Sequence, residues 1–215
     1  MTLGKWSTAI VLCGSGVAAA QAPTPAVEAS PPRYDARVSR DRQIALALSA
    51  APPAVAAHAA VYVLGRNGYE KVREGSNGFS CIVERELVTT MEPQCFDAEG
   101  SHTTLLARLR VEELRAQGKS EPEIARAIRD GYGAGQFRAP TKPGIVYMLS
   151  NENWVFDPSS QHIIHFPGHL MFYAPFMTAQ DLGYETEATL PYLVHPGAPD
   201  ALMIVVPYRA PTSQP

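Results

Sequence analysis

Alternating apolar and polar residues mark a series of short strands in the first half of the chain. Three such runs, rich in Val, Ile and Tyr, cover residues 60–65, 69–74 and 79–84. Two Asn-Gly pairs, Asn67-Gly68 and Asn77-Gly78, separate the runs, and Asn-Gly favours the positive φ angles of tight hairpin turns. The pattern therefore predicts a three-stranded antiparallel meander.

Apolar residues at helical spacing lie before and after these strands. Asp41 is positioned to cap the first helix, and Ser120 with Glu123 forms a capping box that starts the last one. Pro93 and Gly100, in contrast, favour an irregular loop around Cys95. Three helices are expected, over residues 42–51, about 102–117 and about 120–131.

The second half of the chain returns to strands. A polar segment at 150–162 is expected to be a loop. Strands followed by helices and then by strands are typical of an α+β domain. We expect one such domain over residues 40–210, with a mostly antiparallel sheet made of the N-terminal three-stranded meander and C-terminal strands, and with two or three helices. The C-terminal strands are expected at 145–149, 169–176 and 201–208.

The first residues have the pattern of an export signal. Within residues 1–20, a single cation, Lys5, precedes an apolar run that ends in Ala18-Ala19-Ala20. Cleavage there leaves Gln21 as the first residue, followed by a Pro/Ala-rich flexible linker over 21–39. We therefore expect a periplasmic or extracellular protein with no transmembrane segment in its mature chain.

Residues 1–20 have two alternative interpretations, a membrane anchor and a lipoprotein signal. A membrane anchor is disfavoured because the run from Ser7 to Ala20 contains two glycines and is too short to span a bilayer comfortably. A lipoprotein at Cys13 is disfavoured because Leu12 occupies a position where a small residue is expected.

Two cysteines remain after the leader, Cys81 and Cys95. In an exported chain they predict one disulfide, which contributes roughly 3 kcal/mol in the chain-entropy account. The alternative is a nucleophilic Cys81, because NGFSCIV is similar to the Gly/Ser-flanked cysteine of papain-like cell-wall peptidases, with His165 or His169 as base. Those enzymes hold the cysteine at a helix N-terminus, whereas Cys81 is expected within a strand, so the disulfide is favoured.

Charge and composition exclude one class of partner. The chain has 18 basic and 21 acidic residues and a formal net charge of −3. This balance lacks the basic footprint of a nucleic-acid-binding protein. The hydrophobic fraction of 46% is sufficient for a sizeable core.

The segment HIIHFPGH holds half of the six histidines, His162, His165 and His169. Three imidazoles and a water can form a catalytic zinc or copper site, and Glu152 is a nearby candidate base. Pro167-Gly168 forbids one continuous helix, so only His165 and His169 would share a face in an extended segment, unless a loop makes all three converge. The plainer interpretation is that two of these histidines lie on the surface and that the third packs at the start of a strand.

Two further patterns point to binding or to plain structure. Gly131, Gly133 and Gly135 lack the spacing of a phosphate-binding loop and are interpreted as a helix exit. Six aromatic residues within a segment of 23 residues can either line a cleft that binds carbohydrate or lipid, or belong to the core. They are Trp154, Phe156, Phe166, Phe172, Tyr173 and Phe176.

The stretches REGSNGFSCIVER, CFDAEG, GIVYMLSNEN and GHLMFYAP resemble a group of uncharacterised secreted bacterial proteins of unknown function. The resemblance covers most of the mature chain, from Asn77 to Pro207, and implies an exported single domain without implying an activity.

Two hypotheses follow from the sequence. The first is an exported binding or accessory protein, whose ligand is a small molecule or an envelope component bound near residues 150–176. The alternative is a metal- or His-dependent hydrolase in which His165 and His169 hold a metal or move a proton and Glu152 assists as base.

Overall fold

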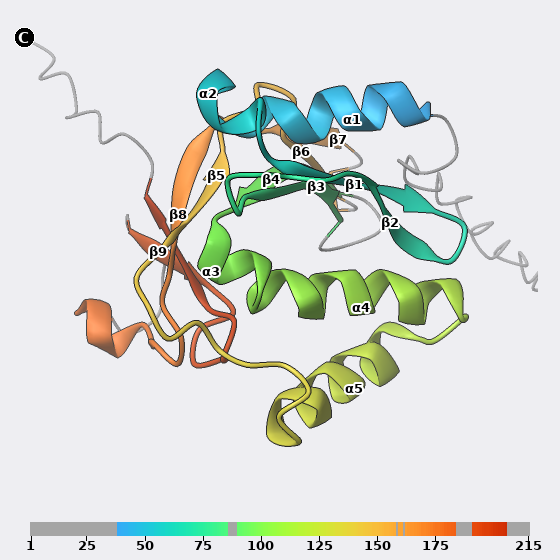
Figure 1. Cartoon of the computed structure of the whole chain (residues 1–215). Coiled ribbons are helices and arrows are strands. Elements are labelled where there is room, and N and C mark those ends of the chain that lie inside the picture. The colour runs from blue at the N-terminus through green and yellow to red at the C-terminus, as the bar shows by residue number, and fades with distance from the viewer. Residues whose placement is uncertain (1–37, 86–89, 158, 161, 184–190, 206–215) are drawn as a thin grey trace, which may run out of the picture. The chain divides into compact units, whose positions relative to one another are not determined.

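A mixed, mostly antiparallel sheet of ten strands forms the centre of the computed structural model (Figure 1). The structure describes residues 38–85, 90–157, 159–160, 162–183 and 191–205. The predicted signal peptide and most of the predicted linker lie outside these residues. The strands are β1 (Ala60–Gly65), β2 (Gly68–Arg73), β3 (Ser80–Glu84), β4 (Thr90–Phe96), β5 (Ile145–Met148), β6 (Trp154–Asp157), β7 (His162–His165), β8 (His169–Tyr173), β9 (Tyr192–Val194) and β10 (Leu202–Val205).

Helices cover both faces of the sheet. Figure 1 shows α1 and α2 over one face, α4 across the other, and α5 packed outside α4. No helix in the described part of the chain has the length and apolarity needed to cross a bilayer. The helices are α1 (Arg40–Ser49), α2 (Pro53–Ala56), α3 (Ala98–Ser101), α4 (Thr104–Ala116), α5 (Glu121–Gly133) and the short 3₁₀ helix η1 (Gln180–Leu182).

The sheet has a core on each face, and β3 shows why. All five of its residues are buried, because alternate side chains enter opposite layers. Cys81 and Val83 belong to the core beneath α1, and Ile82 belongs to the core on the α4 face. This alternation places Glu84 on the α4 face as well.

The α+β class and the mostly antiparallel sheet are confirmed, but one pairing in the predicted meander is wrong. Strands β1 and β2 form the expected antiparallel hairpin, closed at Gly65 and Gly68. Strand β3 instead pairs with β1 in parallel, giving the order β2-β1-β3-β4. The second Asn-Gly is not a hairpin turn: Asn77 binds the carbonyl of Val55 and the amide of Phe79, and so ties the connection to α2.

The predicted irregular loop around Cys95 is also wrong, because Cys95 lies on strand β4. Pro93 is tolerated there because of its place in the ladder. On one side β4 pairs with β6 at Thr90 and Met91 and with β5 at Cys95 and Phe96. Pro93 falls in the gap between these two ladders, where no amide hydrogen is required.

The predicted polar loop at 150–162 contains most of a β-hairpin. Strand β6 pairs with β7 from Trp154–His165 to Asp157–His162. Strand β8 then ends at Tyr173, earlier than predicted, and of the predicted strand at 201–208 the described part is β10.

The predicted helices are present, with different ends. Ser39, rather than Asp41, caps α1 through the amide of Arg42, and the chain before α4 forms the short α3. The capping box at Ser120 and Glu123 is confirmed, and Gly135 follows α5 with φ +75°, as a helix exit requires.

The end of β4, the start of β5 and β8 meet around Tyr173. The Tyr173 hydroxyl donates to Asp97, 3.0 Å away, and Asp97 also accepts from the amides of Gly100 and Ile145. A Cβ added to Gly100 would lie 1.8 Å from the Tyr173 oxygen, so only glycine fits there. These residues have a structural role at the junction of β4, β5 and β8.

Candidate functional site

A cavity of about 410 Å³ opens on the α4 face of the sheet, where β4 changes partner from β6 to β5. Its walls are mostly apolar, and we call it the sheet cavity. Strand alternation explains the lining, since every second residue of each strand faces this side. The main lining residues are Glu92 and Gln94 of β4, Met148 of β5, Val155 of β6, Phe166 between β7 and β8, His169 and Met171 of β8, Tyr192 and Val194 of β9, and Leu202 and Ile204 of β10.

Two polar side chains in this apolar lining carry buried atoms without a partner. The Gln94 Oε1 and His169 Nε2 atoms are both inaccessible to solvent, and neither has a hydrogen bond within the described part of the chain. The residues themselves are 5% and 4% exposed. Strand β5 separates them in the sheet, since its Met148 pairs with His169 of β8 and its other edge pairs with β4, which carries Gln94.

The protonation of His169 follows from its surroundings. Its Nδ1 lies 3.0 Å from the Pro167 carbonyl oxygen, which only accepts, so Nδ1 carries the hydrogen and Nε2 presents a lone pair. Burial lowers the pKa of His169 below its usual 6.5, although the Pro167 bond opposes this. The imidazole is therefore neutral at pH 7, and two residues that line the sheet cavity each carry a buried, unpartnered acceptor.

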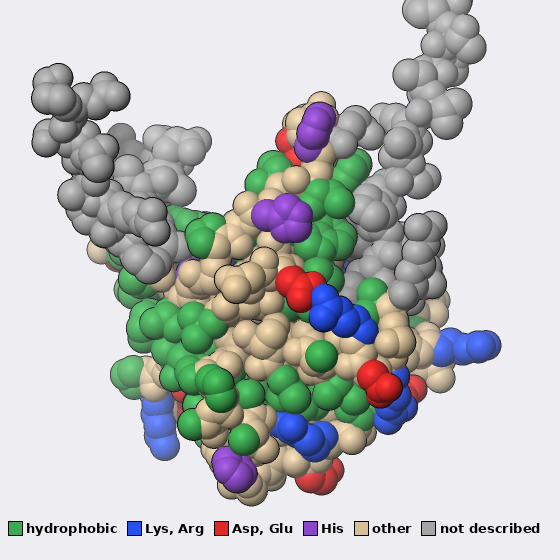
Figure 2. Space-filling model, turned by 90° about the horizontal axis from the view of Figure 1, so that it is seen from above, with side chains coloured by type: hydrophobic (Ala, Val, Ile, Leu, Met, Phe, Trp, Pro, Cys, Tyr) green, Lys and Arg blue, Asp and Glu red, His purple; other side chains and the backbone are tan. Residues whose placement is uncertain are grey.

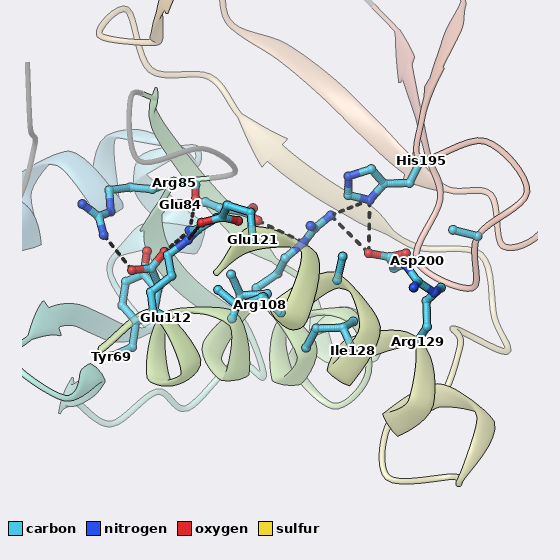
Figure 3. A pocket seen from close by; sticks show the side chains of 15 residues that line it. Tyr69, Glu84, Arg85, Arg108, Glu112, Glu121, Ile128, Arg129, His195 and Asp200 are labelled. Carbon is cyan, nitrogen blue, oxygen red and sulfur yellow. Dashed lines mark hydrogen bonds and ion pairs between the residues drawn. The ribbon is translucent and has the colours of Figure 1, made fainter. Parts of the chain in front are cut away.

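A second hollow adjoins the sheet cavity and is dominated by ion pairs (Figure 3). Arg108 of α4 reaches Glu84 at 3.0 Å and Asp200 at 3.4 Å, and His195 Nδ1 lies 3.2 Å from the same Asp200 oxygen. Glu84 and Arg108 line both hollows. This ionic chain joins β3, α4 and the segment between β9 and β10.

A second group of charges lines the opposite end of the same hollow. Arg85 donates to Glu112 at 2.7 Å, and Arg115 contacts both Glu112 and Glu121. The side chains of Arg85 and Glu112 are 5% and 4% exposed. Glu112 thus sits between two guanidinium groups and connects the end of β3 to α4, and Arg115 extends the group to Glu121 of α5.

His195 was not identified from the sequence. It has φ +53°, which is uncommon outside glycine and is found at functional positions. Its Nδ1 lies 3.2 Å from Asp200 Oδ2 and 3.3 Å from Arg108 Nη2, so the tautomer of the ring decides whether Nδ1 donates to the carboxylate or accepts from the guanidinium. Such a pair suits proton transfer, but no Ser, Thr or Cys lies among the described lining residues of this hollow.

Titration of the Asp200 carboxyl makes the free energy of unfolding depend on pH in the acid range. Burial raises the pKa of its carboxyl, but the bond from His195 and the charge of Arg108 outweigh burial and lower the pKa to about 2. Because the pKa of the Asp200 carboxyl is lower in the folded protein than in the unfolded chain, where it is near 3.8, the ionised carboxylate stabilises the fold above that pH. This stabilisation is lost as the pH falls from about 4 to 2. We expect Asp200→Asn to remove about 2 kcal/mol at pH 6 and much less near pH 2, as measured by denaturant unfolding at each pH.

The matched control for this pH dependence is Asp130→Asn, on the exposed end of α5. It should leave the pH dependence of wild type unchanged. A constant difference between Asp200→Asn and wild type across this pH range would contradict the assignment.

Comparison with family models, with curated proteins and with solved structures finds no match to this chain.

The predicted histidine site is not assembled among the described residues. His162 and His165 lie on the exposed strand β7, three positions apart and so on opposite faces, whereas His169 is buried in the sheet cavity. Glu152 pairs with Arg42 of α1. Within the described ranges, no group of three His, Cys, Asp or Glu side chains has the geometry to hold a metal.

Surface charge is dispersed on the face above α1. Figure 2 shows basic and acidic side chains scattered singly or in pairs there, and histidines that stand apart from one another.

Cys81 is joined to Cys95 in a disulfide, which removes the thiol that a nucleophile requires. The bond links directly opposed residues of β3 and β4, and both are fully buried. The predicted disulfide is therefore confirmed.

The predicted aromatic group does not form one cleft. Phe166 lines the sheet cavity, and Phe176 lines a separate cavity beside α5. Phe156 and Tyr173 are buried. The sequence thus located one wall of the sheet cavity, but it missed Gln94, which lies on the unpredicted strand β4.

Proposed function

We propose that this chain is a binding protein whose sheet cavity holds a small, largely apolar molecule that carries hydrogen-bond donors. The observation that carries the proposal is the pair of buried acceptors, Gln94 Oε1 and His169 Nε2, in an apolar wall. A volume of about 410 Å³ lies within the range of small-molecule sites.

Gln94 Oε1 and His169 Nε2 lose their hydrogen bonds to water when the protein folds. A buried polar atom left without a hydrogen bond costs about 1–3 kcal/mol. A ligand hydroxyl or N–H that reaches Gln94 or His169 recovers much of this cost, while its apolar body contacts Met148, Met171 and Ile204. The hydrogen bond and the apolar contact together favour an apolar ligand with a hydrogen-bond donor over either a charged or a fully apolar ligand.

We further propose that the protein is exported and functions in the periplasm or outside the cell. The Cys81–Cys95 disulfide supports this, because such bonds persist in oxidising compartments. The export-signal pattern of residues 1–20 and the resemblance to secreted proteins agree with it.

A matched pair of probes tests the binding proposal. We expect 2-naphthol, which has a hydroxyl donor, to bind at least tenfold more tightly than 2-methoxynaphthalene, which has the same rings without a donor. The Gln94→Leu variant should reduce this ratio severalfold, because it removes one acceptor while keeping a similar volume. Titration followed by naphthyl fluorescence gives both affinities.

The control is Gln136→Leu, the same change at an exposed position, which should leave the ratio unchanged. Equal affinity for the two probes in wild type, absence of binding, or an unchanged ratio in Gln94→Leu would each contradict the proposal.

One further measurement separates the binding protein from the hydrolase alternative. Zinc or copper should leave the melting temperature of the purified protein unchanged. A metal-dependent rise that disappears in a His165→Ala/His169→Ala variant would instead favour the hydrolase.

A further inference from the structure

A third cavity, of about 670 Å³, lies beside the C-terminal half of α5 and is separate from the sheet cavity. We call it the α5 cavity. Its apolar walls include three aromatic side chains, Tyr132, Phe137 and Phe176, and the first two rings pack with their centroids 5.6 Å apart. Aromatic walls of this kind favour a flat apolar ligand.

One of the residues that line this cavity carries a buried hydroxyl. The Tyr132 hydroxyl oxygen is buried and has no hydrogen-bond partner among the described residues. Burial, together with the nearby Asp200 carboxylate, raises the pKa of Tyr132. The phenol therefore stays protonated, and Tyr132 adds no negative charge to the cavity wall.

Two cations stand at the edge of the same cavity. Arg129 and Arg138 are exposed and line the α5 cavity, and no side-chain ion pair or hydrogen bond holds either guanidinium within the described ranges. The one carboxylate in the lining, Asp200, is balanced by Arg108 and His195. The rim thus keeps uncompensated positive charge.

The aromatic residue opposite α5 is held in an unusual conformation. Phe176 has φ +63°, and its side chain remains 60% exposed. Its amide bonds to the Ala198 carbonyl at 2.9 Å, and Gly197 bonds back to Met177 at 2.7 Å. These bonds hold a large apolar ring over the cavity mouth at a cost in backbone strain, which is typical of binding sites.

We propose that the α5 cavity binds an aromatic carboxylate. The ring of the ligand lies among Tyr132, Phe137 and Phe176, and its carboxylate meets Arg129 and Arg138 at the rim, where guanidinium forks match carboxylate geometry. This site is independent of the proposed function of the sheet cavity.

Binding of 2-naphthoate tests the proposal, with 2-naphthamide as the uncharged counterpart of similar shape. We expect wild type to bind naphthoate at least tenfold more tightly than naphthamide, and the preference to weaken as salt is raised. The Arg129→Gln/Arg138→Gln variant should lose at least tenfold in naphthoate affinity. Both arginines are exposed, so the double variant should keep its wild-type melting temperature.

Two control variants locate the site. Arg126→Gln changes an exposed arginine of α5 that lies outside this cavity, and Gln94→Leu changes the sheet cavity; neither should alter naphthoate affinity. Equal affinity for naphthoate and naphthamide, or an unchanged naphthoate affinity in the double arginine variant, would overturn the proposal. A loss confined to Gln94→Leu would place naphthoate in the sheet cavity and overturn it equally.

Discussion

Replacing Glu112 with glutamine is expected to lower the free energy of unfolding by about 3–5 kcal/mol. Glu112 is 4% exposed and pairs with both Arg85 and Arg115. Removing one member of a buried ionic group costs more than the group itself contributes, because the charges that remain have lost solvation without keeping their partner. Urea unfolding of the purified protein measures the change.

The neighbouring residue provides a control for this prediction. Glu113 pairs with Arg110, and their side chains are 45% and 36% exposed. Solvent screens such a pair, so Glu113→Gln should cost under about 1 kcal/mol. If the two variants lose similar amounts of stability, the buried network between β3, α4 and α5 does not have the role assigned to it.

Loss of the disulfide is expected to have the second-largest effect. The Cys81→Ala/Cys95→Ala variant should lose roughly 3 kcal/mol, because the bond closes a loop with a sequence separation of 14 and so restricts the unfolded chain. For a domain of this size the melting temperature should fall by about 6–12 °C. Alanine is preferred to serine because both positions are fully buried, where a hydroxyl would add a cost of its own.

Reductant and thiol titration check the same prediction. Reductant present during unfolding should destabilise wild type by about as much as the substitution does, and should not affect the double variant. Two titratable thiols in denatured protein that was isolated without reductant would contradict the disulfide and, with it, the proposal of export.

Local sequence signals predicted the elements that local interactions specify. The β1–β2 hairpin follows from Asn67-Gly68, and the start of α5 follows from the capping box at Ser120. The disulfide followed from cysteine number and from the expected compartment. In each case the decisive interaction joins residues close in sequence, or the residue type leaves few alternatives.

Errors arose where distant segments decide the outcome. Pro93 reads as a strand breaker, yet it is accommodated because β4 exchanges β6 for β5 at that point. Strand β3 was expected to pair with β2, but it lies on the other side of β1. Neither outcome is encoded within a short window, because both depend on which strand arrives from elsewhere in the chain.

The candidate site was predicted only in part. The segment at 150–176 supplies His169 and Phe166 to the sheet cavity, whereas His162 and His165 belong to an exposed strand. Gln94, Arg108 and His195 have no local pattern that distinguishes them from ordinary polar residues. They became candidates only once burial and partners were known.

The sequence by itself determined which segments become strands and helices in most of the domain, and that two cysteines pair. The tertiary structure alone decided the order of the strands, the place of Glu112 between two arginines, and the presence of Gln94 and His169 in the lining of one cavity. The reason is physical: hydrophobic periodicity and capping act over a few residues, whereas the cost of a buried, unpartnered polar atom exists only after distant strands have excluded water from it.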